Sequence, residues 1–543
     1  MKPKGMIMAE LRLAGRPASP GFAEGVLFHL VERSVTRIAT NDSSREAADL
    51  RRAIADAAQT IGALAEKSEG EAAEMLAFQV AMLEDDALSE GAFIEIEKGS
   101  AADQAWRQAL DAEIQSYRAA DDEYFRARSA DLEDIRDTVL DHLSGGGSVL
   151  AVPPGSIIVA RDLPPSRFLG IDWSKGGAIL LSEGSPSSHV AMLARARGVP
   201  MIIGLGIVPT PDATPVIVDG ASGEAFVEPS ETTRHAFLMR QRDDQEKSGR
   251  AASVASKPAM TADGTPITML INIAGLDDLE GLDPSLCDGI GLVRTEFLFG
   301  EGPDLPDEDT QYHVYRRMIE WAQGRPVTIR TLDAGGDKPI KGLTIDGESN
   351  PFLGVRGVRL SLARPEIFRI QLRALLRAAV HGPLKVMVPM VTVPSELEAV
   401  RMMMGNAFHS LKSEGVTVAV PALGMMIEVP AAALAVSHFN ADFFSIGSND
   451  LVQYTTAAGR DIGAVASLAD VRHPAVLRLI ELVASYGVEA QREVSLCGDA
   501  GGDPTLIPDL LKAGLRTLSA APGLIGRAKL AISEFHLGQS GGR

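Results

Sequence analysis

The sequence predicts an α/β protein of several domains that ends in a (β/α)8 barrel. From Thr265 onward, eight strand-like runs alternate with helical patterns, as a barrel of this kind requires. Between Val149 and about Pro229, short apolar runs separated by turns predict a smaller α/β domain, and the opening LAGRPASPGFAEGVLF has the same texture. Residues from about Asn41 to Leu143 are poor in Gly and Pro and helical in pattern, which predicts an all-α domain inserted into the α/β domain.

The expected domain limits follow from these changes in composition and hydrophobic pattern along the chain. A chain of 543 residues is too long for a single core. A GGG tripeptide ends the helical block, and a charged helical stretch leads from the α/β domain toward the barrel. The expected segments are an α/β domain over 1–30 and 144–229, a helical domain over 31–143, a linker helix over 230–260 and a barrel over 261–543.

Composition narrows the class of protein. The net charge of −20 argues against binding to nucleic acid or to an anionic membrane. Two cysteines provide no disulfide framework, which fits a reducing compartment. No apolar run approaches the ~20 residues of a membrane span. The N-terminal MKPKGMIMAELRLAG lacks the apolar core of a signal peptide, so we expect a cytoplasmic protein.

The stretch GSPSSHVAMLARARG places a histidine at the expected start of a helix. AILL before it predicts a short buried strand, and SEGSPSS predicts a turn. Ser187 and Ser188 are candidate N-caps, which would put His189 where free backbone N–H groups favour an anion. An imidazole there could carry a phosphoryl group as a covalent intermediate. The alternative is a polar residue near a helix cap with no chemical role.

Polar side chains recur at the carboxyl ends of the predicted barrel strands, where barrels of this type carry their chemistry. Glu428 and Asp450 are hard oxygen ligands suited to Mg²⁺, although each could equally be a buried salt-bridge partner. Arginines lie at these ends and in the glycine-bearing loop NPFLGVRG. Their planar guanidinium groups can form paired hydrogen bonds with the carboxylate or phosphate oxygens of a small polyanion. The candidates are Arg294, Arg330, Asp333, Arg356, Glu428, Asn449, Asp450 and Cys497.

Each of the two cysteines could simply be a small buried hydrophobic residue without a chemical role. We interpret Cys287 in this way. Cys497 differs because it stands between a strand and the glycines of SLCGDAGGDP, so its thiol could face the pocket.

Seven segments together resemble the phosphoenolpyruvate-utilising enzymes, and most closely their phosphotransferase-system branch, enzyme I. They are GSPSSHVAMLARARGVPMIIG, GIGLVRTEFLF, RTLDAGGDKP, NPFLGVRG, GMMIEVPAA, FFSIGSNDLVQYTTAAGRD and LCGDAGGDP. The helical segments MLAFQVAMLEDDAL and DDEYFRARSADLEDIRDTVLDHL resemble the helical domain with which that branch binds its phosphocarrier. The resemblance runs from near Ala14 to near Lys529, in the same order as in the family.

The resemblance implies a function and a role for particular residues. His189 would accept the phosphoryl group of phosphoenolpyruvate and pass it to the carrier protein HPr, and Cys497 would protonate the enolate to give pyruvate. Mg²⁺ would be held by Glu428 and Asp450, the α/β domain would swivel, and the barrel would form a homodimer. Phosphoenolpyruvate would be bound by Arg294, Arg330, Arg356, Asn449 and Arg460.

Departures from the family pattern concern the histidine loop and the carrier-binding helices. Ser185 and Ser187 replace a Gly and a Thr of the usual loop, Gln79 replaces a frequent histidine, and Asp499 replaces a frequent Glu. Two other functions remain as alternatives: an ATP-dependent dikinase or synthase of the same family, and a catalytically silent sensor of phosphoenolpyruvate. The first needs a nucleotide loop that the sequence does not offer. The second predicts loss of the histidine, a metal ligand or the cysteine.

Overall fold

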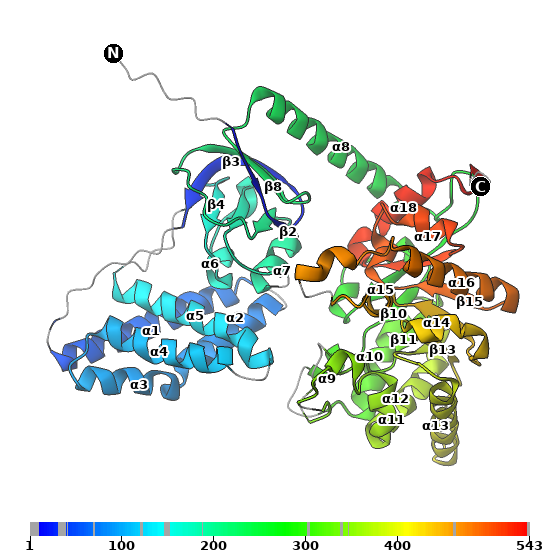
Figure 1. The fold of residues 1–543 in the computed structure, drawn as a ribbon. Coiled ribbons are helices and arrows are strands. Elements are labelled where there is room, and N and C mark those ends of the chain that lie inside the picture. The colour runs from blue at the N-terminus through cyan, green and yellow to red at the C-terminus, as the bar shows by residue number, and fades with distance from the viewer. Residues whose placement is uncertain are drawn as a thin grey trace. The chain divides into compact units, whose positions relative to one another are not determined.

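The computed structural model describes residues 10–30, 40, 42–68, 71–119, 123–145, 152–186, 188–300, 305–336, 340, 342–345, 347–459 and 463–539. Internal contacts divide the chain into two compact units, Met1–Asp243 and Asp244–Arg543 (Figure 1). None of the helices in these ranges combines the length and apolar character that crossing a membrane requires.

The second unit contains a closed barrel of eight parallel strands, as predicted. The strands follow one another round the barrel in chain order, and the last pairs with the first through Thr517 and Thr268. Each strand overlaps the run predicted for it. They are β9 (Thr268–Ile273), β10 (Ile290–Val293), β11 (Val327–Arg330), β12 (Leu384–Val388), β13 (Ala422–Ile427), β14 (Phe443–Ile446), β15 (Glu493–Leu496) and β16 (Thr517–Ala520).

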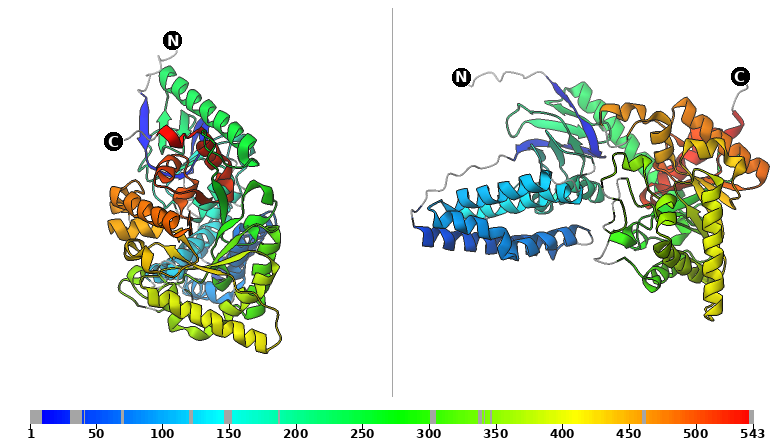
Figure 2. Two further views of the ribbon diagram at one scale, coloured as in Figure 1. Left: turned by 90° about the vertical axis from the view of Figure 1, so that its right-hand side faces the viewer. Right: turned by 60° about the horizontal axis from the view of Figure 1, so that its bottom comes forward.

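Helices surround these strands because parallel strands are apolar on both faces and need cover on the outside. All four residues of β10 are buried, and Phe368 and Leu372 of α12 are buried against the barrel core. Helix α13, yellow in Figure 2, lies at the outside of this unit in both views. The helices are α9 (Phe297–Gly300), α10 (Glu308–Trp321), α11 (Val358–Ala363), α12 (Pro365–Ala378), α13 (Pro394–Ser413), α14 (Pro430–Leu434), α15 (Ser448–Thr456), α16 (Pro474–Ala490), α17 (Ile507–Lys512) and α18 (Ile525–Glu534).

The first unit is built on an eight-stranded sheet with the order β1-β8-β7-β3-β4-β5-β6-β2. Strands β3 to β6 are parallel to one another, and the remaining pairs are antiparallel. The strand predicted from AILL is β5. The strands are β1 (Leu11–Ala14), β2 (Arg16–Ser19), β3 (Phe22–His29), β4 (Ile157–Ala160), β5 (Ala178–Leu181), β6 (Met201–Ile203), β7 (Pro215–Asp219) and β8 (Glu224–Val227).

The residues described between β3 and β4 form five helices, which confirms the predicted insertion of an all-α domain. Their core, centred on Trp106 and Leu110, continues to Phe168 beside the sheet. Figure 1 shows the bundle in blue and cyan. Its helices are α1 (Ser43–Ala65), α2 (Glu71–Glu84), α3 (Asp86–Glu97), α4 (Ala102–Ala119) and α5 (Glu123–Leu143), and α6 (Pro165–Leu169) and α7 (His189–Ala196) belong to the α/β part.

A buried polar contact joins the bundle to the α/β part. Asp134 of α5 accepts hydrogen bonds from the backbone N–H and the hydroxyl of Ser166 in α6, and from Nε2 of Gln79 in α2. Burial is the largest effect on the Asp134 carboxyl group and raises its pKa to about 6.

Helix α8 (Glu231–Ala255) crosses the division between the units. In its first half, the ring of Phe237 lies 5.5 Å from that of Phe22 in β3. In its second half, Arg527 of α18 pairs with Asp244 at 3.1 Å, and Lys529 Nζ donates to the carbonyl of Ala255 at 2.7 Å. Each half is therefore tied to its own unit. The finer domain limits, 1–30, 31–143, 144–229, 230–260 and 261–543, stay predictions.

Candidate active site

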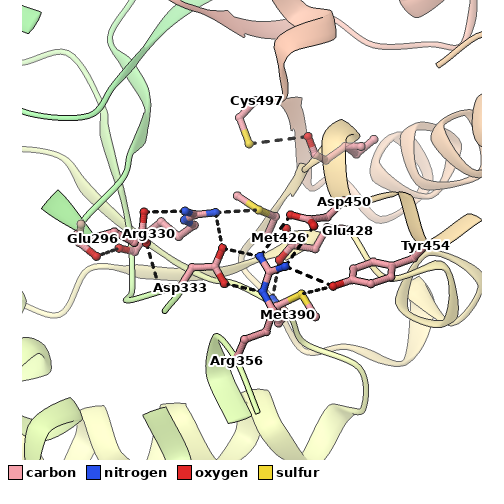
Figure 3. A network of polar contacts seen from close by, with 12 residues as sticks. Glu296, Arg330, Asp333, Arg356, Met390, Met426, Glu428, Asp450, Tyr454 and Cys497 are labelled. Atoms are coloured by element: carbon pink, nitrogen blue, oxygen red, sulfur yellow. Dashed lines mark hydrogen bonds and ion pairs between the residues drawn. The ribbon is translucent and has the colours of Figure 1, made fainter. Parts of the chain in front are cut away.

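The carboxyl ends of five barrel strands bring charged side chains together (Figure 3). Parallel strands of a closed barrel end on one face, so residues far apart in sequence meet there. The group lies after β10, β11, β13, β14 and β15, and in the loop before α11. It comprises Glu296, Arg330, Asp333, Arg356, Glu428, Asp450, Tyr454 and Cys497.

Arg356 lies at the centre of this group and is completely buried. Its Nη2 donates to Asp333 Oδ2 at 3.0 Å, and its Nη1 donates to Asp450 Oδ1 at 3.3 Å. Tyr454 Oη accepts a further hydrogen bond from Nη1 at 3.3 Å and donates to the carbonyl of Phe352. Burial opposes the positive charge of Arg356, but the two aspartates outweigh it and raise the pKa of the guanidinium.

Arg330 is the second buried arginine. It pairs with Glu296 Oε2 at 2.8 Å and with Asp333 Oδ2 at 3.0 Å. The same Glu296 accepts a hydrogen bond from the backbone N–H of Asp333 at 2.9 Å, which fixes both partners. The Nε–H of Arg330 has no hydrogen-bond acceptor among the described residues. An unpaired buried donor on a cation is a point at which an anionic ligand gains a hydrogen bond.

Glu428 and Asp450 are the two predicted metal ligands. Glu428 Oε1 accepts from the backbone N–H of Met390 at 2.6 Å, and Asp450 lies in the first turn of α15, where the helix dipole favours a carboxylate. Burial, followed by the charges of Asp450 and Asp333, raises the pKa of Glu428 to about 8. Asp450 also forms the ion pair of the salt-bridge alternative, with Arg356 at 3.3 Å, whereas Glu428 is held by the backbone N–H of Met390.

The carboxyl groups of the cluster outnumber its guanidinium groups, so the cluster lacks positive charge. Four carboxyl groups surround two guanidinium groups, so two negative charges are in excess when all are ionised. Buried charge without compensation is costly, and a divalent cation would supply the compensation. In the described part of the chain, no group of three or more His, Cys, Asp and Glu side chains could hold a metal ion. A site with only two carboxylates would need further oxygens from water and substrate, which is typical of Mg²⁺.

The backbone makes room for these side chains at two glycines. Gly357 has φ +59°, and a Cβ there would lie 2.8 Å from Met390 Cβ and 3.2 Å from Asp333 Oδ1. A Cβ at Gly498 would lie 1.8 Å from Ser448 Oγ. Glycine is therefore required at both positions for sterics and, at Gly357, for its positive φ.

Two predicted residues, Arg294 and Asn449, lie at the rim of this cluster. Asn449 Nδ2 donates to Asp499 Oδ2 at 2.9 Å, and Asp499 approaches Arg294 Nη2 at 4.0 Å. The Arg294 side chain is 42% exposed, so it differs from the two buried arginines in being accessible to solvent. Arg460 lies outside the described residues.

Cys497 lies below this rim and is 2% exposed. It packs with Met387, Met426 and Phe443, and its Sγ–H donates to the carbonyl of Ile446 at 3.7 Å. Burial raises the pKa of the thiol to about 11, so it is protonated at neutral pH. The side chain is therefore packed, as expected of a cysteine that serves only as a small buried hydrophobic residue. It also holds a proton beside the charged cluster.

His189 is the first residue of α7, as predicted. Ser188 is the N-cap, and its hydroxyl accepts from the N–H of Ala191 at 3.4 Å, whereas Ser187 lies outside the described residues. Two arginines hold the preceding loop: Arg195 donates to the carbonyl of Pro186 at 2.8 Å, and Arg16 donates to that of Gly184 at 3.2 Å.

Sequence analysis did not assign three residues of the cluster a function: Glu296, Asp333 and Tyr454. Asp333 was noted only as a polar residue at a strand end. Glu296 follows Arg294 by two residues in GIGLVRTEFLF, and Tyr454 follows Asp450 by four in a helix, so their spacing could have drawn attention to them. Their partners come from other strands, which no local pattern reveals.

Comparisons with known proteins agree on one family. Three family models match the chain: "PEP-utilising enzyme, N-terminal" over 14–128, "PEP-utilising enzyme, mobile domain" over 152–223 and "PEP-utilising enzyme, PEP-binding domain" over 248–537.

Individual relatives match over most of their length. A phosphoenolpyruvate-protein phosphotransferase of Haloferax volcanii is 37% identical over 87% of this chain and 83% of its own. Proteins of the same description from Enterococcus faecalis and Streptomyces coelicolor are 34% and 35% identical, over 94% and 98% of this chain and 92% and 95% of their own.

Proposed function

This chain belongs to the PEP-utilising enzymes, and we propose that it transfers the phosphoryl group of phosphoenolpyruvate (PEP) to His189 and then to a histidine of an HPr-type carrier protein, releasing pyruvate. The observation that carries the proposal is the pair of buried arginines at the barrel mouth, Arg330 at the end of β11 and Arg356 in the loop before α11, the first of which retains an unpaired N–H among the described residues. Such an arrangement suits a small ligand that brings several negative oxygens.

Binding of PEP uses the cluster in two ways. Arg330 offers its free Nε–H, and the exposed Arg294 offers its guanidinium, to the carboxylate and phosphate oxygens of PEP. Asn449 and Arg460 complete the proposed substrate-binding set together with Arg356. The carboxylates around Arg330 and Arg356 hold both guanidinium groups in place before the substrate arrives, so little rearrangement is needed on binding.

Mg²⁺ is the proposed cofactor, and Glu428 and Asp450 would hold it. The donor set fits because both side chains supply hard oxygens, and because a divalent cation would favour the ionised form of Glu428, in which the cluster carries two excess negative charges. When bound, the ion supplies charge neutralisation for the phosphoryl and enolate oxygens. Both oxygens of Asp450 also accept hydrogen bonds from Arg356, which would hold the carboxylate in place for the ion.

Transfer to His189 breaks the P–O bond of PEP and forms a P–N bond to the imidazole. The role of the protein in such a step is mainly alignment and neutralisation of charge. The enolate that remains takes a proton at carbon from Cys497, which gives pyruvate and leaves a thiolate that water reprotonates. A thiol with a pKa of about 11 is suited to this role because it holds its proton until the enolate forms.

The second transfer involves the first unit. The helical domain is the proposed docking site for the carrier, and the α/β domain is proposed to swing between barrel and carrier, because one imidazole must meet two partners in turn. By resemblance to the family, we also propose a cytoplasmic homodimer that associates through the barrel.

Labelled PEP tests the proposed function directly. The chain is incubated with PEP labelled in its phosphoryl group, Mg²⁺ and candidate HPr-type carriers, and the label on each protein is followed in time. We expect label on this chain first and on a carrier afterwards, with one pyruvate formed per transfer. A chain that binds PEP but never acquires label would instead be the silent sensor.

A further inference from the structure

Two polar side chains lie next to Cys497 in the interior of the barrel. Barrel interiors are normally filled by bulky branched residues such as Val, Ile and Leu. Below Cys497, however, Ser445 of β14 and Ser495 of β15 are buried, with 1% and 5% of their surfaces exposed. The two serines are register partners, so their side chains lie on the same face, and Cys497 faces the same way because it follows Ser495 by two residues.

A hydrogen bond joins the two serines beside the thiol. Ser495 Oγ–H donates to Ser445 Oγ at 2.8 Å. Ser445 therefore retains its own hydroxyl proton, and as the diagonal neighbour of Cys497 on the same face it can donate that proton to Sγ. A hydrogen bond from Ser445 lowers the pKa of the thiol and so opposes the larger effect of burial.

A second pair of side chains fixes the cysteine backbone. Asn272 Nδ2 of β9 donates to the carbonyl of Cys497 at 2.9 Å, and Ser519 of β16 donates to Asn272 Oδ1. Gly291 of β10 leaves the space for Ser519, because a Cβ there would lie 2.4 Å from its Oγ. Cys497 is thus held at its carbonyl by one polar pair and contacted at its sulfur by another.

We propose that Ser445, oriented by Ser495, is a positioning residue for proton donation: its hydroxyl holds Cys497 Sγ and stabilises the thiolate left after the enolate is protonated. This rests on the proposed role of Cys497. In the step, the S–H bond breaks, a C–H bond forms at the enolate carbon and the S–H electron pair stays on sulfur. The thiolate would lie among Met387, Met426 and Phe443, whose side chains have no hydrogen-bond donor, whereas the Ser445 hydroxyl can donate a hydrogen bond and so stabilise the negative charge.

The test uses the full chain in a Cys287→Ser background, which leaves Cys497 as the only thiol. The rate of its alkylation by iodoacetamide is followed against pH. Ser445→Ala should lower the alkylation rate about ten- to a hundredfold at each pH between about 7 and 10, the size expected for losing a hydrogen bond to a charged group. PEP turnover should fall about ten- to a hundredfold for the same reason. Phosphoryl exchange between His189 and the carrier should not change.

Matched variants separate positioning from packing. Ser495→Ala keeps the direct contact with sulfur and should shift the profile less than Ser445→Ala does, while Ser445→Thr keeps the hydroxyl and should restore both readouts. Thr328→Val removes a buried hydroxyl from β11, which pairs with neither β14 nor β15, and should leave both readouts unchanged.

An unshifted alkylation profile in Ser445→Ala overturns the inference, whatever happens to turnover. If Ser445→Ala does not fold, the profiles of Ser495→Ala and Ser445→Thr decide. Failure of the proposed function itself has a different signature, because the wild-type chain would then show no PEP turnover, and normal turnover in Cys497→Ala would reject only the proposed role of Cys497.

Discussion

At the scale of single residues, the main feature of the cluster at the barrel mouth is that its buried charges compensate one another. Arg330 and Arg356 are buried, and each has carboxylate partners at about hydrogen-bond distance. Removing one partner of such a pair leaves an uncompensated buried charge, which is far more costly than the loss of an exposed pair. The side chains that surround the arginines are therefore as much a part of the site as the arginines.

The first prediction concerns the two proposed metal ligands. Glu428→Gln and Asp450→Asn each remove one negative charge with little change in shape, so Mg²⁺ binding should weaken steeply and PEP turnover should fall by roughly a hundredfold or more. Turnover is titrated with Mg²⁺ for each variant and for the wild type. A wild-type Mg²⁺ requirement in both variants would reject this pair as ligands.

A second prediction at this scale divides the two half-reactions. Cys497→Ala should reduce PEP turnover by about a hundredfold to ten-thousandfold, the usual contribution of a general acid. Phosphoryl exchange with a phosphorylated carrier should stay near normal, because no enolate is involved. Both reactions are measured on one preparation, with a thermal melt to control for folding. A residue that only packs predicts a small change in turnover, and equal loss of both activities in a folded variant would refute the division.

At the scale of secondary-structure elements, the polar contact between α5 and α6 makes the first unit sensitive to pH. Asp134 has a pKa of about 6 in the fold, above the value of about 4 for an exposed aspartate. Because the folded state binds the proton more tightly, the stability from this group is complete below about pH 4 and is lost as pH rises through 6. The difference amounts to roughly 3 kcal/mol.

The third prediction follows from that sign. Asp134→Asn cannot ionise, so protection of the α5 amides from hydrogen exchange should fall in the wild type relative to the variant between about pH 4 and pH 6. Comparing the two proteins at each pH removes the intrinsic pH dependence of exchange. A constant ratio of exchange rates across this range would contradict the assignment.

The elements also show what sequence can and cannot predict. All eight barrel strands and the strand before His189 were predictable, because each is a short apolar run between turn residues. The sequence predicted an N-cap at Ser187 or Ser188, and the structure has Ser188 in that position. The contacts of Glu296 with Arg330, and of Ser445 with Ser495, were not, because each joins residues on different strands whose register is set only by barrel closure.

At the scale of the whole molecule, the two units are proposed to divide the work. His189 and the helical domain lie before Asp244, and the cluster proposed to bind PEP lies after it. Helix α8 contacts the first unit through Phe237 and the second through Arg527, so motion between the units requires a change within or beside this helix.

The fourth prediction tests that division with a fragment that ends near Ser256. It retains the whole of α8 and the contact between Phe237 and Phe22, but lacks the barrel. The fragment should exchange phosphate with a phosphorylated HPr-type carrier and should take no label from PEP. A fragment with native circular dichroism that exchanges with no carrier would contradict the proposed division.

The central claim is that His189 carries the phosphoryl group, and labelling from PEP tests it most directly. Wild-type chain should acquire acid-labile, base-stable label in the presence of Mg²⁺, as should His235→Ala, a control in the exposed part of α8. His189→Ala should acquire none while its thermal melt stays that of the wild type. Full labelling of His189→Ala would show that the phosphoryl group resides elsewhere and would contradict the account.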